Sequence, residues 1–133
     1  MIVVDASALT DALVDDGPQG DSARSELAAD PQWAAPGHLI VEVVSAIRGK
    51  VLGGTLGSQR AGEAIAALSQ LVVVQVDIAE LVDRMWQLRQ NLSAYDAAYV
   101  AAAEALGCPL VTGDARLAKA AGVRSRVTVV PRS

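Results

Sequence analysis

Short runs of consecutive apolar residues alternate along the chain with segments in which apolar residues recur every three or four positions. The first pattern is typical of strands buried in a parallel sheet, and the second of helices with one buried face. Strands are predicted at residues 2–4, 33–36, 72–76, 110–112 and 127–130. Helices are predicted between them, at residues 7–14, 20–29, 38–52, 58–68, 77–92, 94–105 and 115–121.

Turn and capping signals support these boundaries. Asp15-Asp16-Gly17-Pro18 ends the first helix, and Gly53-Gly54 ends the third. Asp77-Ile78-Ala79-Glu80 has the form of a capping box. Because strands alternate with helices, the connections are expected to be right-handed crossovers in a mostly parallel sheet. We therefore predict an α/β fold, a three-layer α/β/α sandwich that forms a single domain over residues 1–133.

Composition limits the classes of function. No apolar run reaches the roughly 18 residues that a membrane span needs, so no membrane association is expected. Cys108 is the single cysteine, which excludes an intramolecular disulfide and a cysteine-rich metal site and favours a reducing, cytoplasmic setting. The formal net charge of −4 is unlike that of most nucleic-acid-binding proteins, although acidic residues that hold a cation would contribute to it.

Four acidic residues lie within or beside strongly apolar segments: Asp5, Glu42, Asp96 and Asp114. Asp5 and Asp114 follow short strands, whose carboxyl ends face the crevice where open parallel sheets bind ligands. Asp96 is expected in the first turn of its helix, and Glu42 within an apolar helix. Carboxylates gathered in one place repel one another unless protons or cations intervene. A bound divalent metal ion is the simplest explanation for the set.

Each acid also has a purely structural interpretation. Asp5 and Asp114 could be N-caps of the helices that follow them, and Ser93 with Asp96 could form a capping box. Glu42 could point from its helix into solvent. The sequence leaves these alternatives open for each residue taken singly, and the joint placement favours a common site.

Taken together, the segments around the acids resemble a known family. Val3-Val4-Asp5-Ala6-Ser7, Glu42 in its apolar helix, Tyr95-Asp96-Ala97-Ala98-Tyr99-Val100-Ala101 and Val111-Thr112-Gly113-Asp114 are similar to the motifs of PIN-domain ribonucleases. More specifically, they resemble the VapC toxins of toxin–antitoxin pairs. The resemblance extends from Met1 to Val130.

The resemblance implies roles for particular residues. Asp5, Glu42, Asp96 and Asp114 match the catalytic acids of the family, and the three aspartates would be the principal metal ligands. Thr112 matches a hydroxyl residue that would help orient the last acid. Ser7 is a further candidate hydrogen-bond donor to the site, with simple helix capping as the alternative.

The implied activity is that of a divalent-metal-dependent endoribonuclease, the toxin of a type II toxin–antitoxin module. Mg²⁺ suits a site with only oxygen ligands, and Mn²⁺ is possible. Arg116 and Lys119 follow the last acid and are candidate RNA contacts, with a solvated charged surface as the alternative. His38 has no partner that the sequence can place, so it is interpreted as a helix-start residue.

The resemblance also implies partners. These are a cognate VapB-type antitoxin, an RNA substrate such as tRNA, and a second copy of the chain in a homodimer. Trp33 and Trp86 are candidate interface residues, with a place in the core as the alternative.

Rival classes fit the residues less well. An aspartyl-nucleophile phosphatase needs a second aspartate two residues after the first, where Ser7 stands. A phosphoacceptor receiver domain needs adjacent acids at the end of its first strand, which this chain does not have there. The remaining alternative is a catalytically degenerate PIN-like domain that serves as a protein-binding module. The presence of all four acids argues against it.

Overall fold

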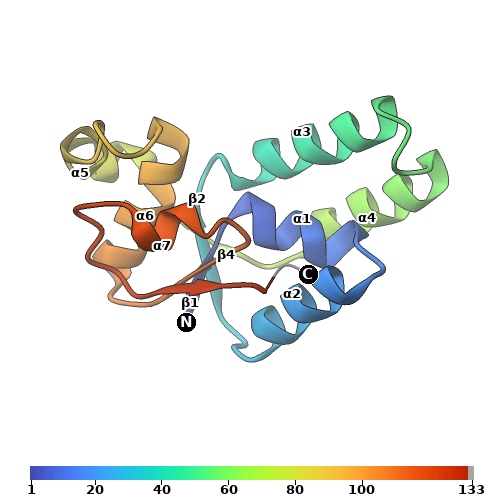
Figure 1. The fold of residues 1–133 in the computed structure, drawn as a ribbon, viewed down its shortest axis with the longest axis horizontal. Helices are drawn as coiled ribbons and strands as arrows, with labels where there is room; N and C mark the ends of the chain where they lie inside the picture. The colour runs from blue at the N-terminus through green and yellow to red at the C-terminus, as the bar shows by residue number, and fades with distance from the viewer. Residues whose placement is uncertain (132–133) are drawn as a thin grey trace.

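The computed structural model describes residues 1–131, and its centre is a five-stranded sheet in which every neighbouring pair is parallel (Figure 1). The strands lie in the order β3-β2-β1-β4-β5. Their bounds are Ile2–Val4 for β1, Trp33–Pro36 for β2, Val74–Val76 for β3, Leu110–Thr112 for β4 and Val127–Val129 for β5. The predicted parallel sheet is therefore confirmed.

Helices cover both faces of this sheet, as the three-layer prediction requires. Figure 1 shows α1 to α4 together on one side, and α5 to α7 on the other. The bounds are Ala6–Val14 for α1, Pro18–Ala28 for α2, Leu39–Leu52 for α3, Ser58–Gln70 for α4, Val82–Gln87 for α5, Ala94–Leu106 for α6 and Arg116–Lys119 for α7; a 3₁₀ helix, η1, spans Ile78–Leu81.

The chain order reverses in the middle of the sheet. From β1 the chain proceeds to β2 and β3 on one side, and it returns to β4 and β5 on the other side of β1. Val4 near the end of β1 is paired with Val111 of β4, so the carboxyl ends of these two strands lie side by side. A reversal of this kind is where open parallel sheets leave room for a ligand.

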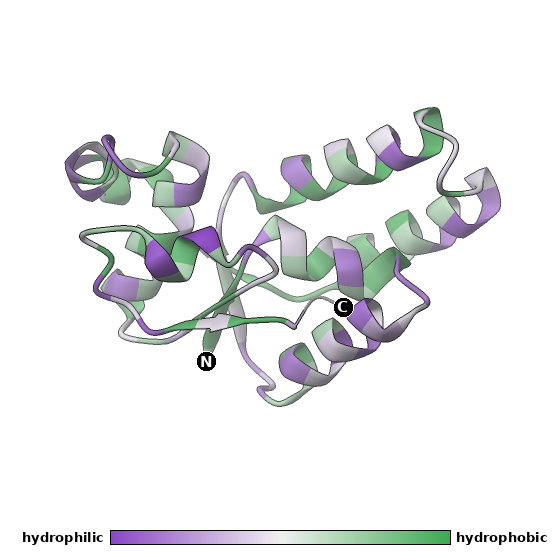
Figure 2. Ribbon diagram, viewed as in Figure 1, coloured by the Kyte–Doolittle hydropathy of each residue, from purple (hydrophilic) through white to green (hydrophobic). Residues whose placement is uncertain are grey.

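Close packing around β1 depends on small residues in α6. This helix contacts β1, β2 and β4. Its alanines at positions 97, 98, 101, 102 and 103 are at most 2% exposed. Because alanine has no side chain beyond Cβ, the helix can approach the sheet closely without leaving voids. Polar surface lies elsewhere, and Figure 2 shows hydrophilic residues on several of the other helices, α2 and α7 among them.

Three predicted elements, one strand and two helices, are clearly wrong in extent. The strand predicted at 72–76 begins only at Val74, and Val72 is 90% exposed. β3 is an edge strand that pairs with β2 from Val74 onwards, so its first β-branched residues have no partner strand. β-propensity requires such a partner to take effect.

The helix predicted at 77–92 is broken into η1 and α5 and ends at Gln87. Asp77 does cap its start, but its carboxylate accepts from the N–H of Ala79, which favours a tight 3₁₀ turn. Leu81 and Leu88 are buried, whereas Val82 is 54% exposed. The helix predicted at 115–121 likewise shortens to Arg116–Lys119.

Gly20 allows α2 to pack closely against the turn that follows α1. A Cβ at Gly20 would lie 1.8 Å from the backbone carbonyl oxygen of Asp15. We expect Gly20→Ala to lower the free energy of unfolding by about 1–3 kcal/mol, because backbone atoms have to move apart. Urea denaturation measures this change.

The matched control is Gly62→Ala in α4, where nothing lies within 4 Å of the added Cβ. There the substitution should raise the free energy of unfolding by about 0.5–1 kcal/mol, through the higher helix propensity of alanine. Equal effects of the two substitutions would contradict the close approach at Gly20.

Candidate functional site

Asp5 lies where β1 ends and α1 begins, and it is only 4% exposed. Its Oδ1 atom accepts a hydrogen bond from the backbone N–H of Ala8 at 2.9 Å, so Asp5 is the N-cap of α1. The capping interpretation is therefore correct for this residue. The cap leaves further acceptor capacity on the carboxylate, which two hydroxyl groups use.

These hydroxyls belong to Ser7 and Thr112. Ser7 Oγ donates to Asp5 Oδ1 at 2.7 Å, and Thr112 Oγ1 donates to Asp5 Oδ2. Thr112 Oγ1 in turn accepts from the N–H of Asp114 at 3.0 Å, and Ser7 Oγ accepts from the N–H of Gly113 at 2.9 Å. The two residues thus attach the loop after β4 to the carboxylate after β1. Thr112 contacts the backbone of the last acid and the side chain of the first.

Burial raises the pKa of Asp5 to about 6. The hydrogen bonds from Ala8, Thr112 and Ser7 act in the opposite direction, and the nearby negative charge of Asp96 adds to the rise. Asp96 lies half-buried in the first turn of α6. Its N–H donates to Ser93 Oγ at 3.2 Å, so Ser93 does cap α6. That cap involves the backbone of Asp96 and does not explain its carboxylate.

Glu42 lies in the first turn of α3, with its side chain 32% exposed. Its Oε1 atom accepts from the hydroxyl of Tyr99 at 2.9 Å and lies 2.9 Å from Nε2 of His38. Tyr99 is 1% exposed. Burial and the negative charges of Glu42 and Asp5 raise its pKa far above the usual value. Glu42 therefore does not simply point into solvent.

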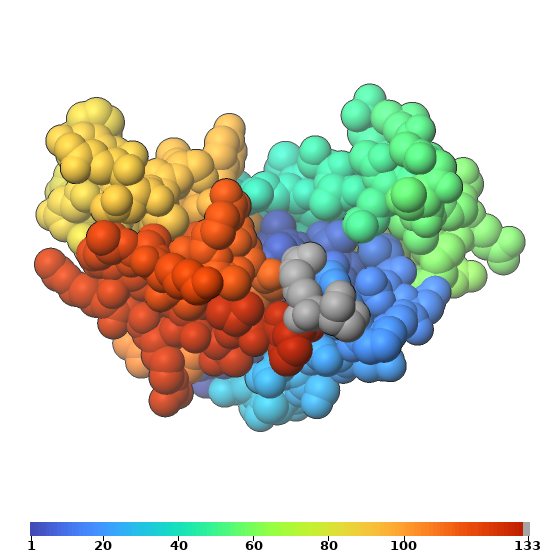
Figure 3. Space-filling view, viewed as in Figure 1, coloured from blue at the N-terminus to red at the C-terminus, as the bar shows by residue number. Residues whose placement is uncertain are grey.

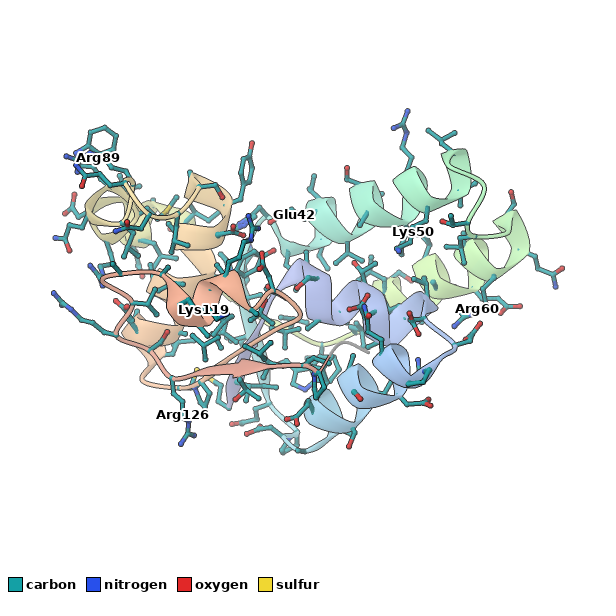
Figure 4. The ribbon with its side chains drawn as sticks, in the orientation of Figure 1. Glu42, Lys50, Arg60, Arg89, Lys119 and Arg126 are labelled. Carbon is teal, nitrogen blue, oxygen red and sulfur yellow. The ribbon has the colours of Figure 1, made fainter. Side chains whose placement is uncertain are left out.

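Asp114 is bound by a neighbouring guanidinium group. Arg116 Nε lies 3.0 Å from both carboxylate oxygens of Asp114, and Nη2 lies 2.5 Å from Oδ2. The backbone N–H of Arg116 also donates to Asp114 Oδ1, at 2.9 Å. The formal N-cap of α7, Ala115, offers no capping side chain, so the Asp114 carboxylate fills this role through the N–H of Arg116, and the capping interpretation holds here too. Arg116, a predicted RNA contact, is 83% exposed and ion-paired here, whereas Lys119 is exposed at the end of α7 (Figure 4).

Hydrogen bonds and charge interactions thus link the four acids. Figure 3 shows a notch between α3 and the orange segments that carry α6 and α7, with α1 (blue) at its floor, and Figure 4 labels Glu42 at the start of α3. Electrostatic interaction joins Asp5 to Asp96, and Tyr99 joins Glu42 to Asp5. Among residues 1–131, no group of three or more acidic, histidine or cysteine side chains is close enough to hold one metal ion. Hydroxyl and guanidinium groups lie between the carboxylates.

Comparison with known proteins decides the family. The family model described as "PIN domain" matches residues 2–123. The VapC ribonuclease Mb0985 of Mycobacterium bovis is 42% identical over 132 residues, which cover 99% of this chain and 100% of that protein. The chain belongs to the PIN domain family, in its VapC group.

Solved structures with low sequence identity share the fold. Mycobacterium tuberculosis VapC20, described as a toxin that cleaves the Sarcin-Ricin loop, superposes with a TM-score of 0.71 at 19% identity, over 93% of this chain and 97% of that one. A toxin–antitoxin complex from Klebsiella pneumoniae gives a TM-score of 0.65 at 21% identity over the full length of both chains. In residues 1–131 of this VapC-family chain, no helix has the length and apolarity to cross a membrane.

Two residues of this site, Tyr99 and His38, are not predicted as such by the sequence. Tyr99 stands there only as part of a motif, and the sequence places no partner for His38. A signal was present for both. His38 is four residues before Glu42, and Tyr99 is three residues after Asp96, so each shares a helix face with a site acid. The contact of Tyr99 with Glu42 itself joins two separate helices.

The raised pKa of Asp5 predicts a pH dependence of stability in metal-free buffer. Between pH 4 and 6 the folded state holds a proton that the unfolded state has lost, so the stability of the wild type falls as the pH rises through this range. Asp5→Asn cannot ionise. Relative to wild type, it should therefore gain about 2–3 kcal/mol between pH 4 and pH 7. Urea denaturation at several pH values, with chelator present, measures the difference.

The corresponding control is Asp83→Asn, which removes an exposed carboxylate on α5 and so reports the effect of the charge change alone. A stability difference between Asp5→Asn and wild type that stays constant from pH 4 to pH 7 would contradict the raised pKa.

Proposed function

We propose that this VapC-family chain is a divalent-metal-dependent endoribonuclease and the toxin of a type II toxin–antitoxin module. The observation that carries the proposal is the buried Asp5 carboxylate. In the described part of the chain its hydrogen-bond donors are one backbone N–H and two hydroxyls, and no basic side chain forms an ion pair with it. A second carboxylate, Asp96, is close enough to raise its pKa. The buried Asp5 carboxylate therefore lacks a positive charge to balance it.

The donor set suits Mg²⁺ or Mn²⁺. Asp5, Asp96 and Asp114 would hold the ion directly or through bound water, since no three acidic side chains of residues 1–131 converge closely enough to hold it by themselves. All three present oxygen donors, which these cations prefer over nitrogen and sulfur. When bound, a divalent ion supplies positive charge for the phosphate oxygens and makes a water molecule more acidic. Asp114 would exchange its bond to Arg116 for the ion.

Glu42 has a separate role in the proposal. One of its oxygens is occupied by Tyr99 and His38, and the other has no hydrogen bond within residues 1–131. This second oxygen can orient the attacking water and accept its proton. Hydrolysis of the RNA phosphodiester would then leave a 5′-phosphate and a 3′-hydroxyl, without a covalent intermediate on the protein.

Substrate binding would use cations beside the acids. Arg116 and Lys119 lie on α7, which follows Asp114 directly. With a net charge of −4 and few aromatic residues, the chain is better suited to recognise the shape of a folded RNA such as tRNA than to hold a long single strand by charge or stacking.

The proposed partners are a VapB-type antitoxin and a second copy of the chain, in the cytoplasm. The resemblance to a chain solved in a toxin–antitoxin complex supports the first. Apolar residues on the outside of α3, such as Val41 and Leu52, are 70% and 68% exposed, which is compatible with an interface there.

The direct test uses purified, partner-free protein and total cellular RNA with Mg²⁺, Mn²⁺ or chelator. We expect cleavage with either ion, none with chelator, and a loss of at least about 100-fold in rate for Asp96→Asn, because the proposed metal ligand set is incomplete. Mapping of new 5′ ends measures the cut sites, and Asp83→Asn is the control of equal charge. Cleavage that persists in chelator would sink the proposal, and no cleavage by the wild type would favour the protein-binding alternative.

The proposed RNA contact of Arg116 should affect both the KM for RNA and the salt dependence of binding. Arg116→Gln should raise KM for RNA about 3–10-fold and reduce the slope of log affinity against log salt by about 0.7–0.9, since one phosphate contact is lost. Arg126→Gln removes the same charge before β5, at the opposite end of the sheet, and should leave both quantities unchanged (Figure 4). Equal effects of the two substitutions would show a general charge effect without a specific contact.

A further inference from the structure

Two hydrogen-bonding groups from different places converge on one oxygen of Glu42. The hydroxyl of Tyr99, from α6, donates to Oε1 at 2.9 Å. Nε2 of His38, the residue before α3, lies 2.9 Å from the same atom. Glu42 and Tyr99 are 57 positions apart, so this arrangement exists only in the folded chain.

Tyr99 is suited to fix a carboxylate. Its side chain is 1% exposed and packed within the core, so its hydroxyl has little freedom to move. Burial and the surrounding negative charges keep the phenol protonated, because they raise its pKa far above the usual value. A phenol that stays protonated next to a carboxylate acts as the donor of the bond.

His38 is the second group in contact with this carboxylate oxygen of Glu42. Its Nε2 atom also lies 3.2 Å from the backbone oxygen of Tyr95, so both neighbours of this nitrogen are acceptors. The proton must therefore be on Nε2. The imidazole ring is 4.6 Å from the ring of Tyr99, with an interplanar angle of 48°. His38 thus links the start of α3, with Glu42, to the start of α6, with Asp96.

Without these groups, Glu42 would be a half-exposed side chain with several rotatable bonds. Fixing such a side chain only in the transition state costs conformational entropy. We propose that Tyr99 and His38 are positioning residues that hold Oε1 of Glu42 and so direct its other oxygen to the attacking water. This inference rests on the proposed ribonuclease function. Because positioning acts on the reacting state, the effect should fall on kcat more than on KM.

The kinetic test compares Tyr99→Phe, His38→Ala and His38→Gln with wild type in metal-dependent RNA cleavage. Tyr99→Phe and His38→Ala should each lower kcat about 10–100-fold and change KM less than about 2-fold. His38→Gln retains an N–H donor and should recover part of the loss. The control Thr10→Val removes a hydroxyl that is equally enclosed but bonded to no partner in residues 1–131, and kcat should not change.

A double-mutant comparison shows whether Tyr99 acts through Glu42. In the Glu42→Ala background, Tyr99→Phe should cause no further loss of kcat, because the group that it positions is already gone. Thermal unfolding of each variant checks that the fold is retained. Independent, additive losses in the double variant would overturn the inference, as would an unchanged kcat in Tyr99→Phe.

A spectroscopic readout separates this inference from the proposed function. The side-chain carboxyl ¹³C resonance of Glu42, identified by its absence in Glu42→Gln, should shift in Tyr99→Phe and in His38→Ala but not in Thr10→Val. Absence of cleavage by wild-type protein would overturn the ribonuclease proposal and, with it, the catalytic role of the two residues. Cleavage with no shift of the resonance would overturn the positioning role alone.

Discussion

The candidate site depends on the buried carboxylate of Asp5. It ends β1, begins α1 and accepts the hydroxyl of Thr112 from the end of β4, 107 positions away. Hydrogen bonds from the protein offset part of the cost of burying this charge, but its pKa remains raised, so the compensation is incomplete. The fold therefore holds, at the reversal point of its sheet, a negative charge that its own groups do not fully stabilise.

The other three acids are stabilised by helix dipoles, by hydrogen-bond donors or by an ion pair. Asp96 and Glu42 lie in the first turns of α6 and α3, where the helix dipole favours a negative charge. Glu42 also has the donors of Tyr99 and His38, and Asp114 has the guanidinium of Arg116. In the proposed function, the helix dipoles would disfavour a bound cation, so the summed charge of the carboxylates would have to outweigh them.

The sequence predicts the part of this site that follows strand ends. It does not predict the features that depend on contacts between elements distant in sequence. Asp5 and Asp114 could be brought together because both follow strands of a parallel sheet. The strand over Val72 and the long helix after Asp77 were wrong, since a missing partner strand and a tight cap overrode local propensity. The bond between Tyr99 and Glu42 joins two helices whose relative placement no local pattern contains.

Asp114 and Asp5 differ in the free energy that each would gain from binding a cation. The bond between Asp114 and Arg116 is exposed on the arginine side, so solvent screens it and its exchange for another cation requires little free energy. Asp5 has no basic partner to displace within residues 1–131, and its buried charge gains more from a cation than an exposed one would. In the proposed function, Asp5 thus supplies most of the driving force for ion binding. In the same proposal, the exchange at Asp114 would release Arg116, at the edge of the site, for a phosphate of the RNA.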